Sequence, residues 1–241
     1  MNMDLSQELL SRLDSLRKEL AGLSAAEGLR RLSQAFEGSI AFSSSLGIED
    51  QLLTHHIFEQ DLPIRVFTLD TGRLFNESYT LLHKTNNHYG KKIEVYFPKH
   101  EAVEQLVNEK GPMSFYNSID DRKQCCYIRK VEPLNRALQG VQVWVTGIRA
   151  EQSGARQELQ LLEWDEAHQL IKYNPLLDYT LEQVKAEVKT LHIPYNPLHD
   201  KGFVSIGCAP CTRAIAEGED FRAGRWWWED NSKKECGLHA R

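Results

Sequence analysis

Apolar residues recur at helical spacing at the start of the chain. Leucines at positions 5, 9, 13, 16 and 20 fall on one face of a helix, with charged residues between them. A second helix is expected from Ser24, because the Ser-Ala-Ala-Glu sequence that begins there fits a capping box. The pattern therefore predicts that residues 1–38 form helices packed on the rest of the domain.

Strand and helix patterns alternate from residue 39 to residue 146. Each predicted strand is a short apolar run, and each predicted helix is longer and mixed in polarity. Such alternation with short turns is typical of an open parallel sheet covered by helices on both faces. The predicted strands are Ser39–Phe42, Ile64–Leu69, Ile93–Phe97 and Val141–Thr146, and the predicted helices span residues 48–60, 76–88, 100–109 and 122–138.

The pattern weakens toward the end of the chain. Two further strands are expected within residues 159–173, followed by a helix from Thr180 to Leu191 that opens on a threonine cap. From Asn196 onward several glycines and three consecutive tryptophans replace regular patterning. The sequence predicts an α/β fold with an open, mostly parallel doubly wound sheet in residues 39–207. Residues 208–241 are expected to form an irregular C-terminal tail of the same domain.

The composition and charge of the chain indicate a globular protein and argue against several other classes. The 241 residues are 41% hydrophobic and 26% charged, a balance that excludes wholesale disorder. A net charge of −5 argues against a globally basic nucleic-acid binder. Apolar runs are too short to cross a bilayer, and the N-terminal sequence lacks the pattern of a secretory signal. A cytoplasmic protein that binds neither nucleic acid nor membrane is expected, and a homo-oligomer is left open.

The carboxyl ends of the first two predicted strands carry small polar residues and glycine. In a doubly wound sheet, ligands bind at these ends. Hydroxyl and backbone N–H groups at a helix N-terminus can hold an anion, and glycine lets the backbone approach a ligand. Each loop alone is equally typical of an ordinary capping turn, but the two together favour a nucleotide site. The candidates are Ser43, Ser44 and Ser45 in the first loop, and Leu69, Asp70, Thr71 and Gly72 in the second.

A third loop, residues 146–156, also leaves the end of a predicted strand. It carries two arginines beside small polar residues. Guanidinium groups match the geometry of phosphate and sulfate, although a solvated charged loop has the same composition. Its candidate ligand-binding residues are Gly147, Arg149 and Arg156.

Five cysteines occur in the chain, and four of them form two close pairs. An odd count without a secretory signal argues against a disulfide framework. Cys125 and Cys126 are adjacent in a predicted helix, whereas Cys208 and Cys211 have C-x-x-C spacing. Buried cysteines that only fill space have no reason to follow such spacing. The clustering therefore indicates metal binding or thiol chemistry.

Four thiolates suit either a structural zinc ion or a [4Fe–4S] cluster. Adjacent residues on a helix point about 100° apart, which is awkward for the ligands of one tetrahedral ion. A cuboidal cluster presents separate iron corners, so diverging thiolates can each reach one. The cysteine pattern therefore predicts one [4Fe–4S] cluster, with zinc as the alternative.

Cys236 lies outside this set of four. Lys233, Lys234 and His239 are close to it in sequence and can favour its thiolate form. A terminal cysteine beside glycine is normally exposed, and an idle surface thiol is the alternative. The neighbouring positive charges favour a reactive cysteine.

Four of these segments together closely resemble the motifs of the assimilatory, thioredoxin-dependent adenylyl-sulfate reductases of the PAPS/APS reductase family. The segments are Cys125-Cys126, Cys208-Ala-Pro-Cys211, Gly224-Arg-Trp-Trp-Trp228 and Glu235-Cys-Gly-Leu-His239. The resemblance runs from about Ser39 to His239 and is most specific in the tail. It implies an adenine nucleotide alpha-hydrolase-like fold. The implied reaction, in sulfate assimilation and cysteine biosynthesis, converts adenylyl sulfate and a dithiol to sulfite, AMP and a disulfide.

The resemblance also implies roles for particular residues. Cys236 matches the nucleophile that attacks the sulfate sulfur and becomes S-sulfocysteine. The two cysteine pairs match the ligands of the [4Fe–4S] cluster, and the three strand-end loops match those that hold the nucleotide. One departure is the serine-rich first loop, which replaces most of the glycine found in ATP-splitting relatives and suits a substrate without a triphosphate. Residues that match the sulfate-binding set are Lys130, Arg222, Arg225 and His239.

Three alternative functions are compatible with the sequence. A reductase of the 3′-phosphorylated substrate, or one that uses both substrates, is the first, although enzymes of that branch commonly lack the four cysteine ligands. The second alternative is an ATP pyrophosphatase-type enzyme on the same fold, but Cys236 would have no role in that reaction. The third is a zinc-stapled binding module without catalysis.

Overall fold

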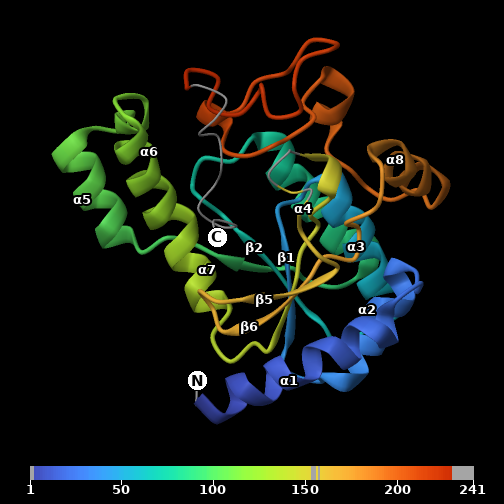
Figure 1. The fold of residues 1–241 in the computed structure, drawn as a ribbon. Helices are drawn as coiled ribbons and strands as arrows, with labels where there is room; N and C mark the ends of the chain where they lie inside the picture. The colour runs from blue at the N-terminus through green and yellow to red at the C-terminus, as the bar shows by residue number, and fades with distance from the viewer. Residues whose placement is uncertain (1–2, 153–155, 157, 230–241) are drawn as a thin grey trace.

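The computed structural model describes residues 3–152, 156 and 158–229 (Figure 1). In that part of the chain, the strands form one six-stranded sheet in the order β3-β2-β1-β4-β6-β5. All neighbouring strands are parallel except β5, which runs antiparallel to β6. The expected open, mostly parallel sheet is confirmed. The strands are β1 (Ile40–Ser44), β2 (Arg65–Leu69), β3 (Glu94–Tyr96), β4 (Val143–Val145), β5 (Leu162–Asp165) and β6 (Leu170–Tyr173).

The helices follow the predicted order, and two of them have the caps that the sequence predicts. Ser24 and Glu27 form the expected capping box, and Thr180 caps its helix in the same way with Gln183. The α-helices are α1 (Met3–Leu20), α2 (Ala25–Ala35), α3 (Ile48–Glu59), α4 (Asn76–Tyr89), α5 (His100–Lys110), α6 (Ile119–Cys126), α7 (Glu132–Ala137) and α8 (Leu181–Thr190). Short 3-10 segments are η1 (Ser114–Tyr116), η3 (Ala150–Gln152), η5 (Pro197–Lys201) and η6 (Ala209–Cys211).

The sheet is buried on both faces, as a parallel sheet requires. Alternate side chains of β1 point to opposite sides, so Ile40 and Phe42 join one core and Ala41 joins another. The first core contains residues of α1, α2, α3 and α8, whereas the second contains residues of α7. Figure 1 shows these two groups of helices on opposite sides of the sheet.

The single helix predicted over residues 122–138 is more complex than its pattern suggests. Helical structure begins at Ile119, where Ser118 caps the helix, and ends at Ala137. Between α6 and α7 the segment η2 (Tyr127–Val131) is a π-helix. Such segments are rare and often lie at functional sites. Here the π-helix directly follows the adjacent cysteines Cys125 and Cys126.

The order of the strands fixes where a ligand can bind. The chain winds from β1 to β2 and β3 in one direction, then crosses over to β4 on the other side of β1. The carboxyl ends of β1 and β4 therefore flank the point at which the sheet changes direction. In doubly wound folds the ligand crevice lies at this position.

Residues after α8 form an irregular segment, drawn orange to red across the top of the sheet in Figure 1. An antiparallel bridge joins Thr212 to Arg225, and the Trp226 N–H donates to the Cys211 carbonyl at 3.2 Å. Trp226 is 1% exposed. The segment is therefore packed onto the cysteine-bearing part of the fold. In the described residues, no helix is long and apolar enough to span a membrane.

Candidate active site

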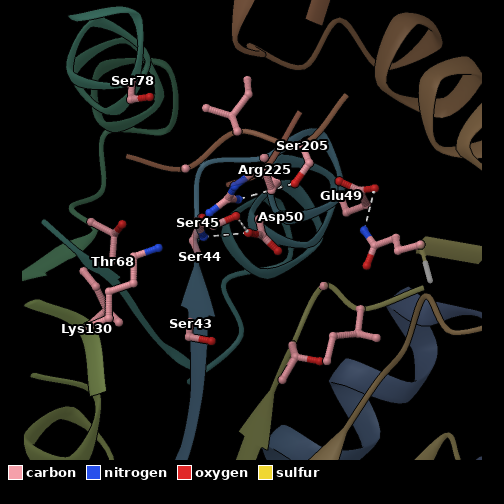
Figure 2. A pocket seen from close by; sticks show the side chains of 18 of the residues that line it. Ser43, Ser44, Ser45, Glu49, Asp50, Thr68, Ser78, Lys130, Ser205 and Arg225 are labelled. Carbon is pink, nitrogen blue, oxygen red and sulfur yellow. Dashed lines mark hydrogen bonds between the residues drawn. The ribbon is translucent and has the colours of Figure 1, made fainter. Parts of the chain in front are cut away.

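A pocket opens at the carboxyl ends of β1, β2 and β4, and residues of the C-terminal segment form part of its wall (Figure 2). Elements far apart in sequence meet there, because the winding of the sheet brings these strand ends together. The sequence-predicted site residues that line the pocket are Ser43, Ser44, Ser45, Leu69, Thr71, Lys130, Gly147, Arg156, Arg222 and Arg225.

The serine-rich segment is partly strand rather than loop. β1 continues through Ser44, two residues beyond the predicted end, because Ser43 pairs with Phe67 of the parallel neighbour β2. The Ser43 hydroxyl accepts a bond from the Trp144 indole N–H at 2.8 Å. The Ser44 hydroxyl accepts one from the backbone N–H of Leu46, whose φ of 62° is left-handed. The Ser43 hydroxyl therefore links β1 to β4, and the Ser44 hydroxyl shapes the turn at the end of β1.

Two carboxylates on the first turn of α3 also line the pocket. Asp50 accepts bonds of 2.6 Å from both the backbone N–H and the hydroxyl of Ser45. Burial raises the pKa of Asp50 to about 7, although the bonds from Ser45 act in the opposite direction. Glu49 instead accepts bonds from the Arg149 guanidinium at 2.9 Å and the Gln152 amide at 3.0 Å. The two neighbouring acids therefore have different electrostatic surroundings.

Three sequence candidates lie behind the pocket rather than in its lining. Arg149 is fully buried and pairs with Glu49 and Glu151, because a guanidinium that turns inward needs carboxylate partners. Asp70 accepts bonds from the Gly72 N–H at 2.7 Å and the Tyr79 hydroxyl at 3.0 Å. The structure therefore places Asp70 and Gly72 within the turn after β2, where they bond each other.

Four cations line the pocket: Lys130 from η2, Arg156, and Arg222 and Arg225 from the C-terminal segment. Arg225 is buried, and its guanidinium lies 4.8 Å from the Trp226 ring centroid and 3.4 Å from the Ser205 hydroxyl. Any side chain at Gly207 would overlap this guanidinium. The glycine therefore makes room for the Arg225 side chain beside the pocket.

The four predicted ligand cysteines gather in one apolar cluster next to this pocket. Cys125 and Cys126 come from the end of α6, and Cys208 and Cys211 from η6. The Cys208 sulfur lies 3.2 Å from the hydroxyl of Thr71, a residue of the pocket wall. None of these four cysteines is in a disulfide bond. Among the described residues, no three His, Cys, Asp or Glu side chains are arranged to hold one metal ion.

Basic side chains surround the thiols. Burial raises the pKa of Cys211 to about 12, and the nearby Arg225 and Lys130 partly oppose this shift. Burial likewise raises the pKa of Cys125, against the effect of Arg129 and Arg73. Since Lys130 and Arg225 also line the pocket, the thiol cluster and the pocket share the same positive charges.

Several lining residues carry no sequence signal strong enough to find them. Glu49 and Asp50 are acidic residues in what reads as an ordinary first helical turn, and His199 lies in a segment without pattern. Ser205 could have been noticed as a near neighbour of the C-x-x-C pair. The additional polar lining residues are Glu49, Asp50, Thr68, Ser78, Thr146, Gln152, His199 and Ser205. Cys236 and His239 lie outside the described residues.

The fold and the pocket define a doubly wound α/β protein whose ligand site lies where the sheet changes direction. Residues 39–214 match the family model described as the phosphoadenosine phosphosulfate reductase domain, and the chain belongs to this family.

Several proteins of high similarity to this chain are named adenosine 5′-phosphosulfate reductase. The adenosine 5′-phosphosulfate reductase of Allochromatium vinosum is 50% identical over 95% of this chain and 91% of its own length. That of Burkholderia cepacia is 54% identical over 83% of this chain and 80% of its own. A crystal structure of phosphoadenylyl-sulfate reductase from Candida auris, in complex with phosphate, has a TM-score of 0.71 and 28% identity. The match covers 85% of this chain and 97% of that one.

Proposed function

We propose that this chain is an oxidoreductase that converts adenylyl sulfate to sulfite and AMP in sulfate assimilation and cysteine biosynthesis. The observation that carries the proposal is the pocket itself, which strand-end loops suited to a nucleotide line together with Lys130, Arg222 and Arg225, beside the cluster of four cysteines. The names of the relatives, at 45–54% identity, agree with it. Sulfite release from adenylyl sulfate, with thioredoxin as the reductant, tests it.

The proposed reaction has two halves. The Cys236 thiolate attacks the sulfate sulfur, the bond from that sulfur to the AMP phosphate oxygen breaks, and AMP leaves with the electron pair. The enzyme then holds an S-sulfocysteine. A thiolate of the reductant attacks the Cys236 sulfur and expels sulfite, and its second thiol resolves the mixed disulfide. Sulfur has gained two electrons, and the reductant dithiol has become a disulfide.

Positive charge is the main contribution of the pocket to this chemistry. The sulfate sulfur is shielded by anionic oxygens, so a thiolate can approach only when that charge is offset. Preorganised cations in a site with little water provide this offset. We assign it to Lys130, Arg222 and Arg225, with Arg156 nearby and His239 as the family resemblance implies. AMP is a good leaving group, so the reaction demands no general acid.

The nucleotide itself is assigned to the strand ends. Ser43, Ser44, Ser45, Leu69, Thr71 and Gly147 line the pocket there. Asp70 and Gly72 are assigned to shaping the turn after β2, because their polar groups bond within it. Arg149 is assigned to holding Glu49 in place. In this proposal residues 1–38 support the domain, residues 39–207 bind the nucleotide and residues 208–241 supply cluster ligands and the nucleophile.

We assign the four clustered cysteines to one [4Fe–4S] cluster. Cys125, Cys126, Cys208 and Cys211 fit such a group, because four cysteines outside any disulfide lie in one apolar cluster with basic side chains around them. Those charges suit a thiolate-ligated cluster, which is anionic. Its ligands bind separate irons and need not converge on one point, as the ligands of a zinc ion must. When bound, the cluster would supply local charge and a fixed link between α6 and η6.

Thioredoxin, or a similar dithiol protein, is the proposed reductant, and the cytoplasm is the proposed compartment. The S-sulfocysteine of the proposed reaction needs a dithiol to discharge it, and a dithiol protein supplies the two electrons. Cysteine chemistry of this kind also requires a reducing environment.

A reductase of the 3′-phosphorylated substrate is the second candidate. The likeness to the Candida auris phosphoadenylyl-sulfate reductase favours it, since the match covers most of both chains. The cysteine pairs and the names of the more similar relatives favour adenylyl sulfate. Parallel assays with the two substrates separate the candidates.

Loss of one pocket arginine should lower kcat/KM more than loss of an arginine at the surface of the same segment. Arg222→Ala and Arg225→Ala are each expected to lower kcat/KM for adenylyl sulfate by about 10²-fold or more, the typical cost of one preorganised electrostatic contact. Arg213→Ala is the matched control, because Arg213 pairs with Glu219 at the surface and is expected to stay near the wild-type value. Near wild-type rates for both pocket variants would show that the anion binds elsewhere.

A further inference from the structure

Two adjacent carboxylates face the pocket, and a cation balances only one of them. Glu49 is paired with Arg149 at 2.9 Å. Asp50 accepts its bonds from the backbone N–H and the hydroxyl of Ser45. In the described part of the chain, every hydrogen-bond partner of the Asp50 carboxylate is therefore neutral.

Asp50 also lies at the junction of the two strand ends that flank the proposed ligand site. Its Oδ2 atom holds Ser45 at the end of β1. Its Oδ1 atom lies so close to Gly147, in the loop after β4, that a side chain at position 147 would overlap it. Asp50 is 6% exposed, and Figure 2 shows it facing Ser45 in the pocket wall. A charge at this point acts on any ligand held by both loops.

An ionised Asp50 opposes an anionic ligand. Like charges a few ångströms apart repel strongly where burial excludes water, so one of the charges has to be neutralised. The ligand of the proposed reaction has anionic phosphate and sulfate groups that titrate only at low pH. Burial already raises the pKa of Asp50 to about 7, so its proton is available near neutral pH.

We propose that Asp50 takes up a proton when the anionic nucleotide binds, which makes it a positioning residue that links affinity for adenylyl sulfate to pH. In the protonated acid, Oδ2 still accepts the bonds from Ser45 while the proton resides on Oδ1. The inference rests on the proposed function, because its ligand is the substrate of that reaction.

Other charged groups line the same pocket, so the test has to distinguish proton uptake by Asp50 from proton uptake by these groups. The arginines and Lys130 contribute cationic side chains, and Glu49 is paired with Arg149. Burial lowers the pKa of His199, so this residue is the competing proton acceptor. The charged and titratable side chains in the lining are Glu49 and Asp50 from α3, Lys130 from η2, His199 from η5, and Arg156, Arg222 and Arg225.

The test is calorimetric titration of adenylyl sulfate into the full-length Cys236→Ser chain, in which no covalent adduct forms. Titrations in buffers of different ionisation enthalpy give the number of protons taken up. We expect uptake to rise from near zero at about pH 6 to nearly one proton per chain at about pH 8, with Kd increasing toward tenfold per pH unit above about pH 7.

Matched variants identify the proton acceptor. Adding Asp50→Asn should abolish the uptake and make Kd independent of pH, whereas adding His199→Gln should preserve the number of protons taken up and the pH dependence of Kd. Ser45→Ala removes a bond that favours the ionised acid, so it should raise the pKa of Asp50 and move the midpoint of uptake to higher pH. Uptake that persists in Asp50→Asn, disappears in His199→Gln, or is absent from a chain that binds the substrate would overturn the inference. Failure of adenylyl sulfate to bind at any pH would contradict the proposed function itself, and the inference with it.

Discussion

Incubation of the protein with adenylyl sulfate and no reductant is expected to release about one AMP per chain and to leave one SO₃ group, about 80 Da, on Cys236. The proposed reduction proceeds in two half-reactions, and only the second requires the reductant. Without a dithiol the second half-reaction cannot proceed, so the S-sulfocysteine accumulates. Intact-mass measurement, followed by peptide mapping, locates the adduct. Addition of reduced thioredoxin should then discharge it as sulfite.

The Cys236→Ser variant is the direct control for this result. It should bind adenylyl sulfate and form no adduct, because serine at this position is a poor nucleophile. An adduct on any of the other four cysteines, or steady turnover with no adduct at any time, would exclude Cys236 as the nucleophile.

The second large effect is expected at the four clustered cysteines. Protein purified without oxygen should be brown and contain about four irons and four sulfides per chain. Serine at position 125, 126, 208 or 211 should remove the colour, the iron and the activity together. Metal analysis and visible absorption provide readouts that do not depend on turnover.

Cys236→Ser is also the matched control here, because it removes a cysteine outside the set of four. It should keep the full iron content and colour while losing activity. A colourless wild-type protein that contains zinc would favour the single-ion alternative. Full activity in an iron-free preparation would show that the reaction does not require the cluster.

The sequence predicts the order of the α-helices and β-strands because these elements have local signals. Alternating apolar runs fix the order of strands and helices, and capping residues such as Ser24 and Thr180 mark where helices begin. The π-helix Tyr127–Val131 has no comparable signal, since one extra residue per turn leaves the composition of a helix unchanged. The end of β1 was misplaced for a related reason, because pairing with β2 extends the strand into residues that favour turns.

The candidate site could be predicted where chemistry is concentrated in sequence, as in the paired cysteines and the strand-end serines. The role of a residue could not be predicted where it depends on the partner that its side chain contacts in the folded protein. Arg149 and Arg156 leave the same loop, yet Arg149 turns inward to Glu49 and Arg156 lines the pocket. Likewise Glu49 and Asp50 are neighbours in sequence, yet Asp50 bonds to nearby Ser45 whereas Glu49 bonds to distant Arg149 and Gln152.

The measurement that tests the central claim most directly is sulfite release from adenylyl sulfate and from its 3′-phosphorylated form, assayed in parallel with thioredoxin as the reductant. We expect thioredoxin-dependent release of sulfite and AMP in equal amounts from adenylyl sulfate, and a much lower kcat/KM for the 3′-phosphorylated form. No sulfite from adenylyl sulfate, or a higher kcat/KM for the 3′-phosphorylated form, would contradict the assignment.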